Sequence, residues 1–493
     1  MNHRFALLAI PFVLMIMGCN KVNPSIPEDP DTGKEPEQPE VVEPTPGVIN
    51  HAGLAYVWDE SVVPEITIHM TKTEWNKLLK RYDEFSGTVD YFHADFTYKK
   101  GDEVHYIEDG GVRLRGNTSR RRPEGNTGEL HNSTNPDWHH CHFGINFRKF
   151  HKDNDHTING IRKVNLKWFK EDPCYVRELY CYDLFRRYGI WTAAHDVYCR
   201  VWLDIEGDAK PAYFGVYEMI EPIDDKYIEK RVNGMFGSSK GFLWKCIWGI
   251  DGQADLRTDS GNTAPTWKMN WDQDNGINYT YEFKGDEDEF KTAKAQFSDF
   301  LLKLNGKSDE DFHKWIQEVC DVEFLLKTYA VNVAVGMWDD HWNFGNNFYL
   351  YFNSTDIYNY KVFFIPYDYD NSLGTSLQCG AISDSGRQDP YNWGDAGLLM
   401  ERLMKFSDFK KMYKNALLEL ADPANDLFHM NASVPRIKAW QEKIAPYVSN
   451  DTGEDMSISD RPASWGNHSE YRLLDTGNNN FFKVKAETIN KMR

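Results

Sequence analysis

Apolar and polar residues alternate over several short segments in the first half of the chain. Residues 65–71, 143–147, 196–205 and 213–220 repeat with a period of two, and residues 91–114 predict a strand pair turning at 99–102. Such alternation is typical of strands with one buried face. Asp172-Pro173 is typical of a helix start, and Gly189 of a helix end. We therefore expect a strand-rich first half around one prominent helix.

The second half has mainly helical spacing. Residues 290–304, 309–320 and 324–336 predict helices, and the chain from 398 onward is largely helical. One pair of apolar strands interrupts this pattern, at 347–352 and 362–366. The expected fold class is α+β, with a strand-rich part at residues 48–222 and a helix-rich part at 223–493.

The start of the chain has the pattern of an export signal. Arg4 precedes an apolar run over residues 5–17 that ends at Gly18-Cys19. This run is shorter than the roughly 20 residues needed to cross a bilayer and has the size of a signal-peptide core. Residues 16–19 resemble a bacterial lipobox, which predicts a signal peptide at 1–18 and a lipidated Cys19. A plain secretory signal with an incidental cysteine is the alternative.

Residues 20–46 are rich in Pro, Glu, Asp and Thr and poor in apolar side chains. Such a composition cannot bury a core and is typical of an extended spacer. Residues 19–47 are therefore expected to be a tether that holds the remaining chain outside the cytoplasm, anchored to a bacterial membrane in the cell envelope.

Net charge and cysteine content argue against two classes of function, nucleic-acid binding and structural zinc binding. The net charge of −19 argues against a nucleic-acid partner, which usually requires a basic surface. Cys19 is one of eight cysteines, and none of them forms a C-x-x-C pair, so a structural zinc site is not expected. Most of the remaining cysteines are expected to be buried thiols.

Acidic and amide side chains concentrate around the apolar hairpin of the second half. A short hairpin brings its two outer ends together, so these side chains are expected to share a small volume. Oxygen ligands without His or Cys suit a hard cation such as Mg²⁺ or Mn²⁺. Ordinary turn chemistry is the alternative, because Asp and Asn are common in loops. The residues are Asp339, Asp340, Asn343, Asn346 and Asn347 before the hairpin and Asp368 and Asp370 after it.

This arrangement follows the logic of phosphoryl transfer, in which one Asp accepts a proton while an Asn and a second Asp hold metal. The chain also resembles the spore-coat-protein-H (CotH) kinases over most of residues 60–485. The motifs that carry the resemblance are GVRLRGNTS at 111–119, KVNL at 163–166, GVYEMIEPID at 215–224, WD at 338–339, NFYLY at 347–351 and IPYDYD at 365–370.

The resemblance implies an atypical, two-lobed protein kinase that transfers phosphate from ATP to Ser or Thr of an exported protein, with Mg²⁺ or Mn²⁺. Asp339 looks like the catalytic Asp, with Asp340 as the fallback. Asn347 and Asp368 look like the metal ligands, with Asp370 close by. The alternative is a non-catalytic surface lipoprotein on the same scaffold that binds a glycan or protein partner.

The remaining expected roles concern the nucleotide. Arg113 and Arg115 alternate with apolar neighbours and could face the phosphates, or form a structural salt bridge. Glu178 would hold the phosphate-binding Lys, and Glu221 would lie at an adenine-contacting hinge. Where the family commonly has a basic residue, this chain has Asn146. The missing cation could come from Arg148, Lys163, Lys167 or Lys245.

Overall fold

The computed structural model describes residues 49, 51–151, 155–249, 252–258, 267–268, 279–375, 384–462 and 470–493. The expected signal peptide, Cys19 and the tether lie outside these residues and stay predictions. The described residues belong to one compact unit, so the expected boundary at residue 222 also stays a prediction. None of the described helices has both the length and the apolar character needed to cross a membrane.

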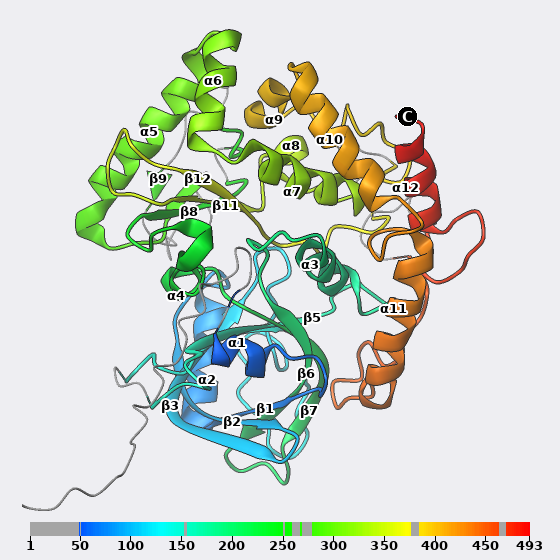
Figure 1. Cartoon of the computed structure of the whole chain (residues 1–493). Helices are drawn as coiled ribbons and strands as arrows, with labels where there is room; N and C mark the ends of the chain where they lie inside the picture. The colour runs from blue at the N-terminus through cyan, green and yellow to red at the C-terminus, as the bar shows by residue number, and fades with distance from the viewer. Residues whose placement is uncertain are drawn as a thin grey trace, which may run out of the picture. The chain divides into compact units, whose positions relative to one another are not determined.

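Seven strands of the first half form a closed barrel (Figure 1). Its order is β1-β2-β3-β4-β5-β7-β6, and a parallel pairing of β1 with β6 closes it. The predicted strands are confirmed, whereas closure was not predicted because it depends on pairing between segments far apart in sequence. The strands are β1 (Glu65–Met70), β2 (Phe92–Lys100), β3 (Glu103–Arg115), β4 (His142–Asn146), β5 (Lys163–Trp168), β6 (Asp196–Ile205) and β7 (Ala212–Ile220).

Alternation along the barrel strands decides which side chains reach the outer face. On β3, Val112 and Leu114 are buried in the barrel core, while the alternating Arg113 and Arg115 are only half-buried. Two helices of the first half, α1 (Ala52–Val57) and α2 (Lys72–Glu84), add apolar side chains to the same core. The polar positions of β3 and β5 are therefore left free to build a site outside the barrel.

The prominent helix of the first half, α3 (Arg177–Arg187), begins later than predicted. Tyr175 has a φ of 60°, a left-handed conformation that a continuing helix cannot contain. The N-cap is Val176, so the predicted cap at Asp172 is wrong. The carboxylate of Asp172 still accepts hydrogen bonds from the backbone N–H groups of Val176 and Arg177 at 2.9 Å each, across the turn at 173–176.

A second sheet lies in the other half, with the order β12-β11-β8-β10-β9. The predicted hairpin is confirmed as an antiparallel pair of β11 and β12. It continues into β8, a strand that the sequence pattern did not predict, which pairs with the other side of β11. The strands are β8 (Phe242–Cys246), β9 (Trp267–Lys268), β10 (Tyr281–Phe283), β11 (Phe348–Phe352) and β12 (Val362–Pro366).

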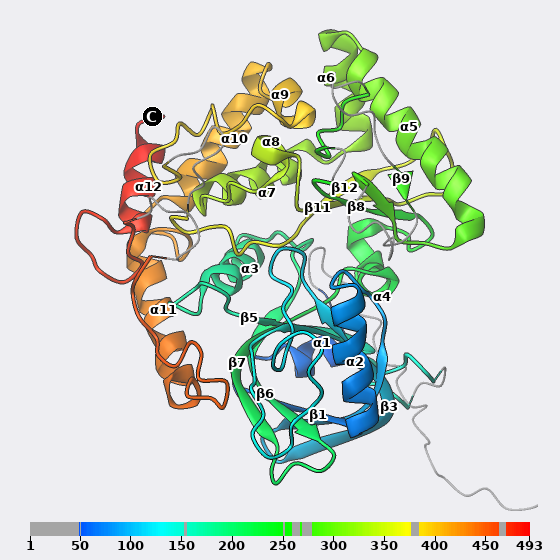
Figure 2. The same ribbon diagram turned by 180° about the vertical axis from the view of Figure 1, so that it is seen from behind.

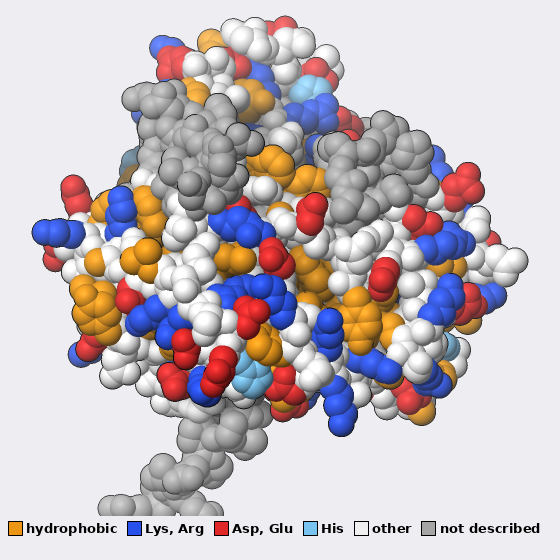
Figure 3. All heavy atoms as spheres, turned by 90° about the horizontal axis from the view of Figure 1, so that it is seen from above, with side chains coloured by type: hydrophobic (Ala, Val, Ile, Leu, Met, Phe, Trp, Pro, Cys, Tyr) orange, Lys and Arg blue, Asp and Glu red, His pale blue; other side chains and the backbone are white. Residues whose placement is uncertain are grey.

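Helices predominate in the second half, as expected. They are α4 (Asp225–Glu229), α5 (Phe290–Gly306), α6 (Asp309–Val319), α7 (Val322–Ala334), α8 (His341–Phe344), α9 (Leu398–Leu403), α10 (Ser407–Leu420), α11 (Met430–Ile444) and α12 (Phe481–Asn490). Acidic and basic side chains are interspersed on the face shown in Figure 3. The mixed helix and strand content agrees with the expected α+β class.

Helix α3 joins the two halves of the molecule. It contacts β6 of the barrel and α7 of the helical half, and both views place it between them (Figures 1 and 2). Its apolar residues belong to the larger hydrophobic core, together with those of α7, α10 and α12. A side chain on α3 can therefore reach groups from either half.

The cysteines of the described part are buried free thiols, as expected. Cys379 lies outside the described residues. The free thiols are Cys141, Cys174, Cys181, Cys199, Cys246 and Cys320.

Candidate functional site

Lys167 lies at the point where three parts of the chain meet. It follows the buried Leu166 on β5, so its side chain leaves the barrel on the outer face. The ammonium donates to Glu178 on α3 and, at 2.6 Å, to Asp368 Oδ1 after β12. The carboxylate of Asp370 is 3.6 Å away. One ammonium thus connects the barrel, the joining helix and the end of the hairpin.

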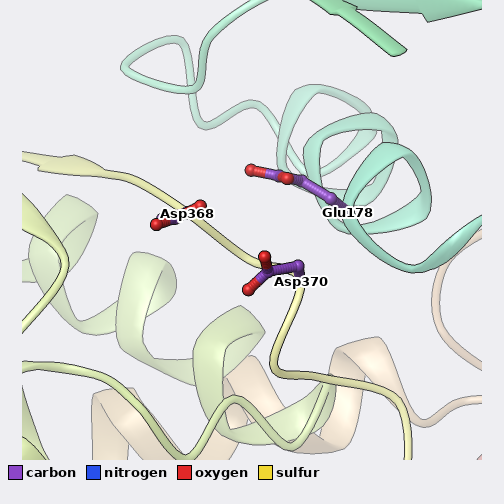
Figure 4. A group of neighbouring side chains, drawn as sticks. All are labelled: Glu178, Asp368 and Asp370. Carbon is purple, nitrogen blue, oxygen red and sulfur yellow. The ribbon is translucent and has the colours of Figure 1, made fainter. Parts of the chain in front are cut away.

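Three carboxylates converge at this point, from α3 and from the segment after β12 (Figure 4). Each of them contacts the ammonium of Lys167. Oxygens of Glu178, Asp368 and Asp370 lie within 4.8 Å of one another. Glu178 is buried, whereas Asp370 is about half exposed, so the group opens to solvent on the Asp370 side. When all three carboxylates are ionised, one ammonium leaves two negative charges, which a divalent cation would neutralise. An all-oxygen ligand set fits Mg²⁺ or Mn²⁺.

The backbone at the site adopts left-handed conformations. Asn347 has a φ of 56° and Asp368 a φ of 62°, which are uncommon for residues other than glycine. Hydrogen bonds from α3 hold the second of these turns: the Asp368 N–H donates to the Tyr182 hydroxyl at 3.1 Å, and the Tyr369 N–H to Glu178 Oε1 at 3.2 Å. Backbone strain of this kind concentrates at functional sites.

The charges shift one another's proton affinities. Burial opposes the charged form of Lys167, but the carboxylates of Asp368 and Glu178 outweigh it and raise the pKa. Burial likewise opposes ionisation of Asp368, but Lys167 outweighs it and lowers that pKa. Desolvation in the recess and the charge on Asp368 raise the pKa of Asp370 to about 8. The group therefore carries more acid than its own cation neutralises.

Asp339, which precedes the hairpin, is held by three amides. Its carboxylate accepts hydrogen bonds from the Nδ2 groups of Asn346 at 2.9 Å, Asn347 at 3.1 Å and Asn371 at 3.2 Å. Burial is the main reason that the pKa of Asp339 rises to about 6, and the charge on Asp368 adds to it. This carboxylate is fixed in orientation and titrates close to neutrality, as a general base requires.

Asp340, the fallback for the catalytic role, has a structural position. It is the N-cap of α8, where its Oδ1 accepts from the Asn343 N–H at 2.8 Å. Its other oxygen accepts from the Asn332 amide, and the residue is 4% exposed. Both carboxylate oxygens thus have partners inside the protein, and Asp339 remains the better candidate for the catalytic Asp.

Two cations flank Tyr367, the residue before Asp368. Arg115 donates to the Tyr367 hydroxyl at 3.3 Å, and the Lys245 ammonium lies 5.1 Å from the centre of its ring. Both cations lower the pKa of Asp368, although less than Lys167 does. Arg113, two residues before Arg115, lies over the ring of Tyr91 instead. The structure therefore brings Arg115 and Lys245 to the site from two different sheets.

Other predicted residues lie around this group. Asn146 pairs with Lys163 across β4 and β5, and Lys163 binds Asp224 at 2.9 Å. The backbone N–H of Arg148 donates to the Asn146 side chain at 3.2 Å. Among the four residues named as candidates for the missing cation, Lys167 is the one that contacts the three carboxylates.

Glu221 is engaged in buried ion pairs. Its carboxylate contacts Arg231 at 2.6 Å and Lys230 at 3.1 Å, and the side chain is 1% exposed. These cations outweigh burial and hold the pKa of Glu221 well below its usual range. A contact of Glu221 with adenine would therefore have to come from its backbone.

Two contributors were missed from the sequence. Asn371 directly follows the IPYDYD motif and continues its polar run, a signal that was present. Tyr182 lies one helical turn after Glu178 on α3, so helical spacing could have placed both on one face. By contrast, no local pattern distinguishes Lys167 from the other lysines near it.

Comparison with known proteins places this geometry in a family. A family model described as CotH kinase protein matches residues 112–475, which include Lys167, Glu178 and the whole hairpin region. No curated protein matches the chain. A kinase family implies a kinase-like function, with a nucleotide, a divalent metal and a protein substrate in general terms. The match spans most of the chain, and the protein belongs to the CotH kinase family.

Proposed function

We propose that the protein is an atypical, two-lobed kinase that transfers phosphate from ATP to Ser or Thr of an exported protein, using Mg²⁺ or Mn²⁺. One observation carries the proposal: the ammonium of Lys167 binds Glu178 and Asp368 together. In protein kinases a lysine from the strand-rich lobe pairs with a glutamate on a helix, while an aspartate of the other lobe holds metal. Lys167, Glu178 and Asp368 would take these three roles here, and the ammonium of Lys167 contacts both carboxylates.

The barrel half would supply positive charge for the phosphates. Lys167 and Arg115 come from β5 and β3, and Lys245 comes from β8 beside them. Fixed cations stabilise the negative charge that develops on a transferred phosphoryl group without having to reorganise. Arg115 and Lys245 are held by Tyr367 rather than by a carboxylate, so their charges stay available to an anion.

Asp339 would act as the base. As the acceptor hydroxyl oxygen forms a bond to the γ-phosphorus, the bond to the bridging oxygen of ADP breaks, and the hydroxyl proton moves to Asp339. The amides of Asn346, Asn347 and Asn371 fix the orientation of this carboxylate. Its raised pKa of about 6 makes it a stronger base than an ordinary Asp while leaving it ionised at neutral pH.

Asp368 and Asp370 would hold the metal, with the side-chain oxygen of Asn347 as the further ligand that the family resemblance implies. When bound, Mg²⁺ or Mn²⁺ would neutralise charge on the phosphates. Glu178 would stay with Lys167 and keep the ammonium in position, because its other oxygen accepts the Tyr369 N–H. This division leaves the more exposed carboxylates facing the open side of the group.

A thermal-shift titration of the full chain with ATP and Mn²⁺ or Mg²⁺ tests the proposal. A ligand that binds only the folded state stabilises it by about 2.7 kcal/mol at a hundred times its Kd. We expect a metal-dependent rise in Tm that Asp368→Ala removes and the exposed control Asp288→Ala keeps. If neither metal produces a shift with ATP, the non-catalytic scaffold that binds a glycan or protein becomes the better account.

We also propose that the kinase works outside the cytoplasm, tethered to a bacterial membrane through lipidated Cys19. The lipobox-like residues 16–19 and the proline-rich spacer support this location. Metabolic labelling with a fatty-acid analogue should mark the wild-type chain and leave a Cys19→Ser variant unmarked. Equal labelling of both chains would contradict the anchor and leave the kinase proposal unaffected.

A further inference from the structure

Cations continue along the outer face of the barrel beyond the site. Among the residues that the structure describes, Arg113, Arg115, Lys149 and Lys245 form no ion pair with a carboxylate. The nearby Arg162 and Lys163, in contrast, both bind Asp224 at 2.9 Å. Uncompensated basic charge is unexpected in a chain whose net charge is −19.

Two glycines let these cations lie close to the barrel. Gly144 pairs with Arg113 across β3 and β4, and a Cβ there would lie 2.9 Å from Arg115 Cδ and 3.3 Å from Arg113 Nε. A Cβ at Gly111 would lie 2.6 Å from Lys149 Cβ. The missing side chains therefore make the space in which the long basic side chains pack.

Tyr91 holds the outer cations in place. The Arg113 guanidinium lies 5.5 Å and the Lys149 ammonium 5.0 Å from the centre of its ring. Burial alone would raise the pKa of Tyr91, but Arg113 and the other cations outweigh it and lower the pKa. A ring supports the two charges without neutralising them, so the local potential remains positive.

The cations fall into two groups by position. Arg115 and Lys245 flank Tyr367, next to Asp368, where the phosphates of the nucleotide would lie. Arg113 and Lys149 meet at Tyr91 instead. The three residues Arg113, Tyr91 and Lys149 form what we call the outer basic patch. Lys149 is exposed, and the other two are half-buried.

We propose that the outer basic patch binds an acidic segment of the protein acceptor, beside the hydroxyl that receives the phosphate. This rests on the proposed kinase function only in taking the partner to be a protein. The two charges are available and rigidly supported, and they lie along the barrel face that leads to Asp368. A nucleic acid fits less well, because the large negative net charge would oppose a long polyanion.

Binding of fluorescent serine peptides to the full chain, measured by anisotropy without nucleotide, tests the patch separately from catalysis. The probes are one peptide whose serine is flanked by Asp and Glu and one flanked by Asn and Gln. The variant Arg113→Gln/Lys149→Gln removes both charges. Lys410→Gln/Lys411→Gln, two exposed lysines on α10, is the matched control.

We expect the acidic peptide to bind more tightly than the neutral one, more weakly as salt rises, and about tenfold more weakly to the patch variant, the scale of two partly exposed ion pairs. The control should bind as wild type does. Equal binding of both peptides, or unchanged binding by the patch variant, would overturn the proposal. Displacement by saturating ATP with Mn²⁺ would also overturn it, by assigning the patch to the nucleotide. The nucleotide-dependent Tm shift reports on the kinase function independently of these outcomes.

Discussion

Replacing Lys167 by Met should separate the structural from the chemical role of the ion pair with Glu178. The variant keeps most of the side-chain volume and removes the one cation that, among the described residues, forms ion pairs with the three carboxylates of the group. Lys167 is 12% exposed and Glu178 is 4% exposed, so the loss occurs away from bulk water.

The size of the effect follows from burial. Breaking a buried ion pair by removing one partner costs about 3–5 kcal/mol, because the other charge is left uncompensated. Burial already raises the pKa of Glu178, so this carboxylate can protonate when Lys167 is gone. We therefore expect the lower end, about 3 kcal/mol of unfolding free energy. Lys167→Met/Glu178→Gln should regain about 2 kcal/mol, because the most buried carboxylate is then neutral and only the more exposed Asp368 and Asp370 are left without their cation.

Catalysis should respond differently to the same two changes. Loss of one fixed electrostatic group costs on the order of 10²–10³ in rate, and the second substitution restores no positive charge. We expect turnover of γ-labelled ATP with Mn²⁺ to be lost in the single variant and to stay lost in the double variant. Urea unfolding followed by tryptophan fluorescence measures stability in parallel.

Lys303→Met is the control for Lys167→Met. Lys303→Met breaks a more exposed pair with Asp299 on α5, so it should cost less than about 1 kcal/mol and leave turnover unchanged. Wild-type turnover by Lys167→Met would refute the role of this lysine. Recovery of turnover in the double variant would show that stability alone limited the single variant.

Three further predictions concern pH and packing. Burial lowers the pKa of Lys485 to about 7. Above that pH the unfolded chain therefore binds one proton more than the folded chain, because an exposed lysine stays protonated. The free energy of unfolding should then rise with pH by up to about 1.4 kcal/mol per unit. Lys485→Met should lose this rise in urea unfolding between about pH 7 and pH 9, and parallel pH profiles for the two chains would contradict the assignment. Gly144→Ala should push Arg115 aside, weakening nucleotide binding about threefold to tenfold in a Tm titration while changing stability by less than about 1 kcal/mol. The kcat/KM of the wild type should rise with pH through about 6 as Asp339 ionises, and a profile flat across that range would exclude Asp339 as the base.

Much of the fold could be predicted because its signals are local. Alternation predicted the barrel strands except β5, two apolar runs predicted the β11–β12 hairpin, and helical spacing predicted α5, α6 and α7. Barrel closure and the insertion of β8 beside β11 were not predictable, because pairing between distant segments leaves no mark in either segment. The start of α3 was misplaced because a left-handed Tyr175 interrupts an otherwise favourable helical pattern.

The candidate site was likewise predictable only where its signals are local. The polar residues before and after the hairpin were predicted to meet because a hairpin brings its outer ends together, and Asn371 does donate to Asp339. The carboxylates of Asp368 and Asp370, however, form their group with Glu178 of α3, which the hairpin does not predict. The choice of Lys167 over Lys163, on the same strand face, depends on where α3 and the residues after β12 pack. The engagement of Glu221 with Arg231 is likewise a tertiary contact that its motif does not reveal.

Direct titration of Mn²⁺ by electron paramagnetic resonance tests the metal–nucleotide site most directly. We expect the full chain to bind Mn²⁺ more tightly when ATP is present, and we expect Asp368→Ala to lose this binding while the exposed control Asp288→Ala retains it. Absence of ATP-linked Mn²⁺ binding in the wild type, or its persistence in Asp368→Ala, would contradict the assignment of Asp368 and its neighbours as the site of phosphoryl transfer.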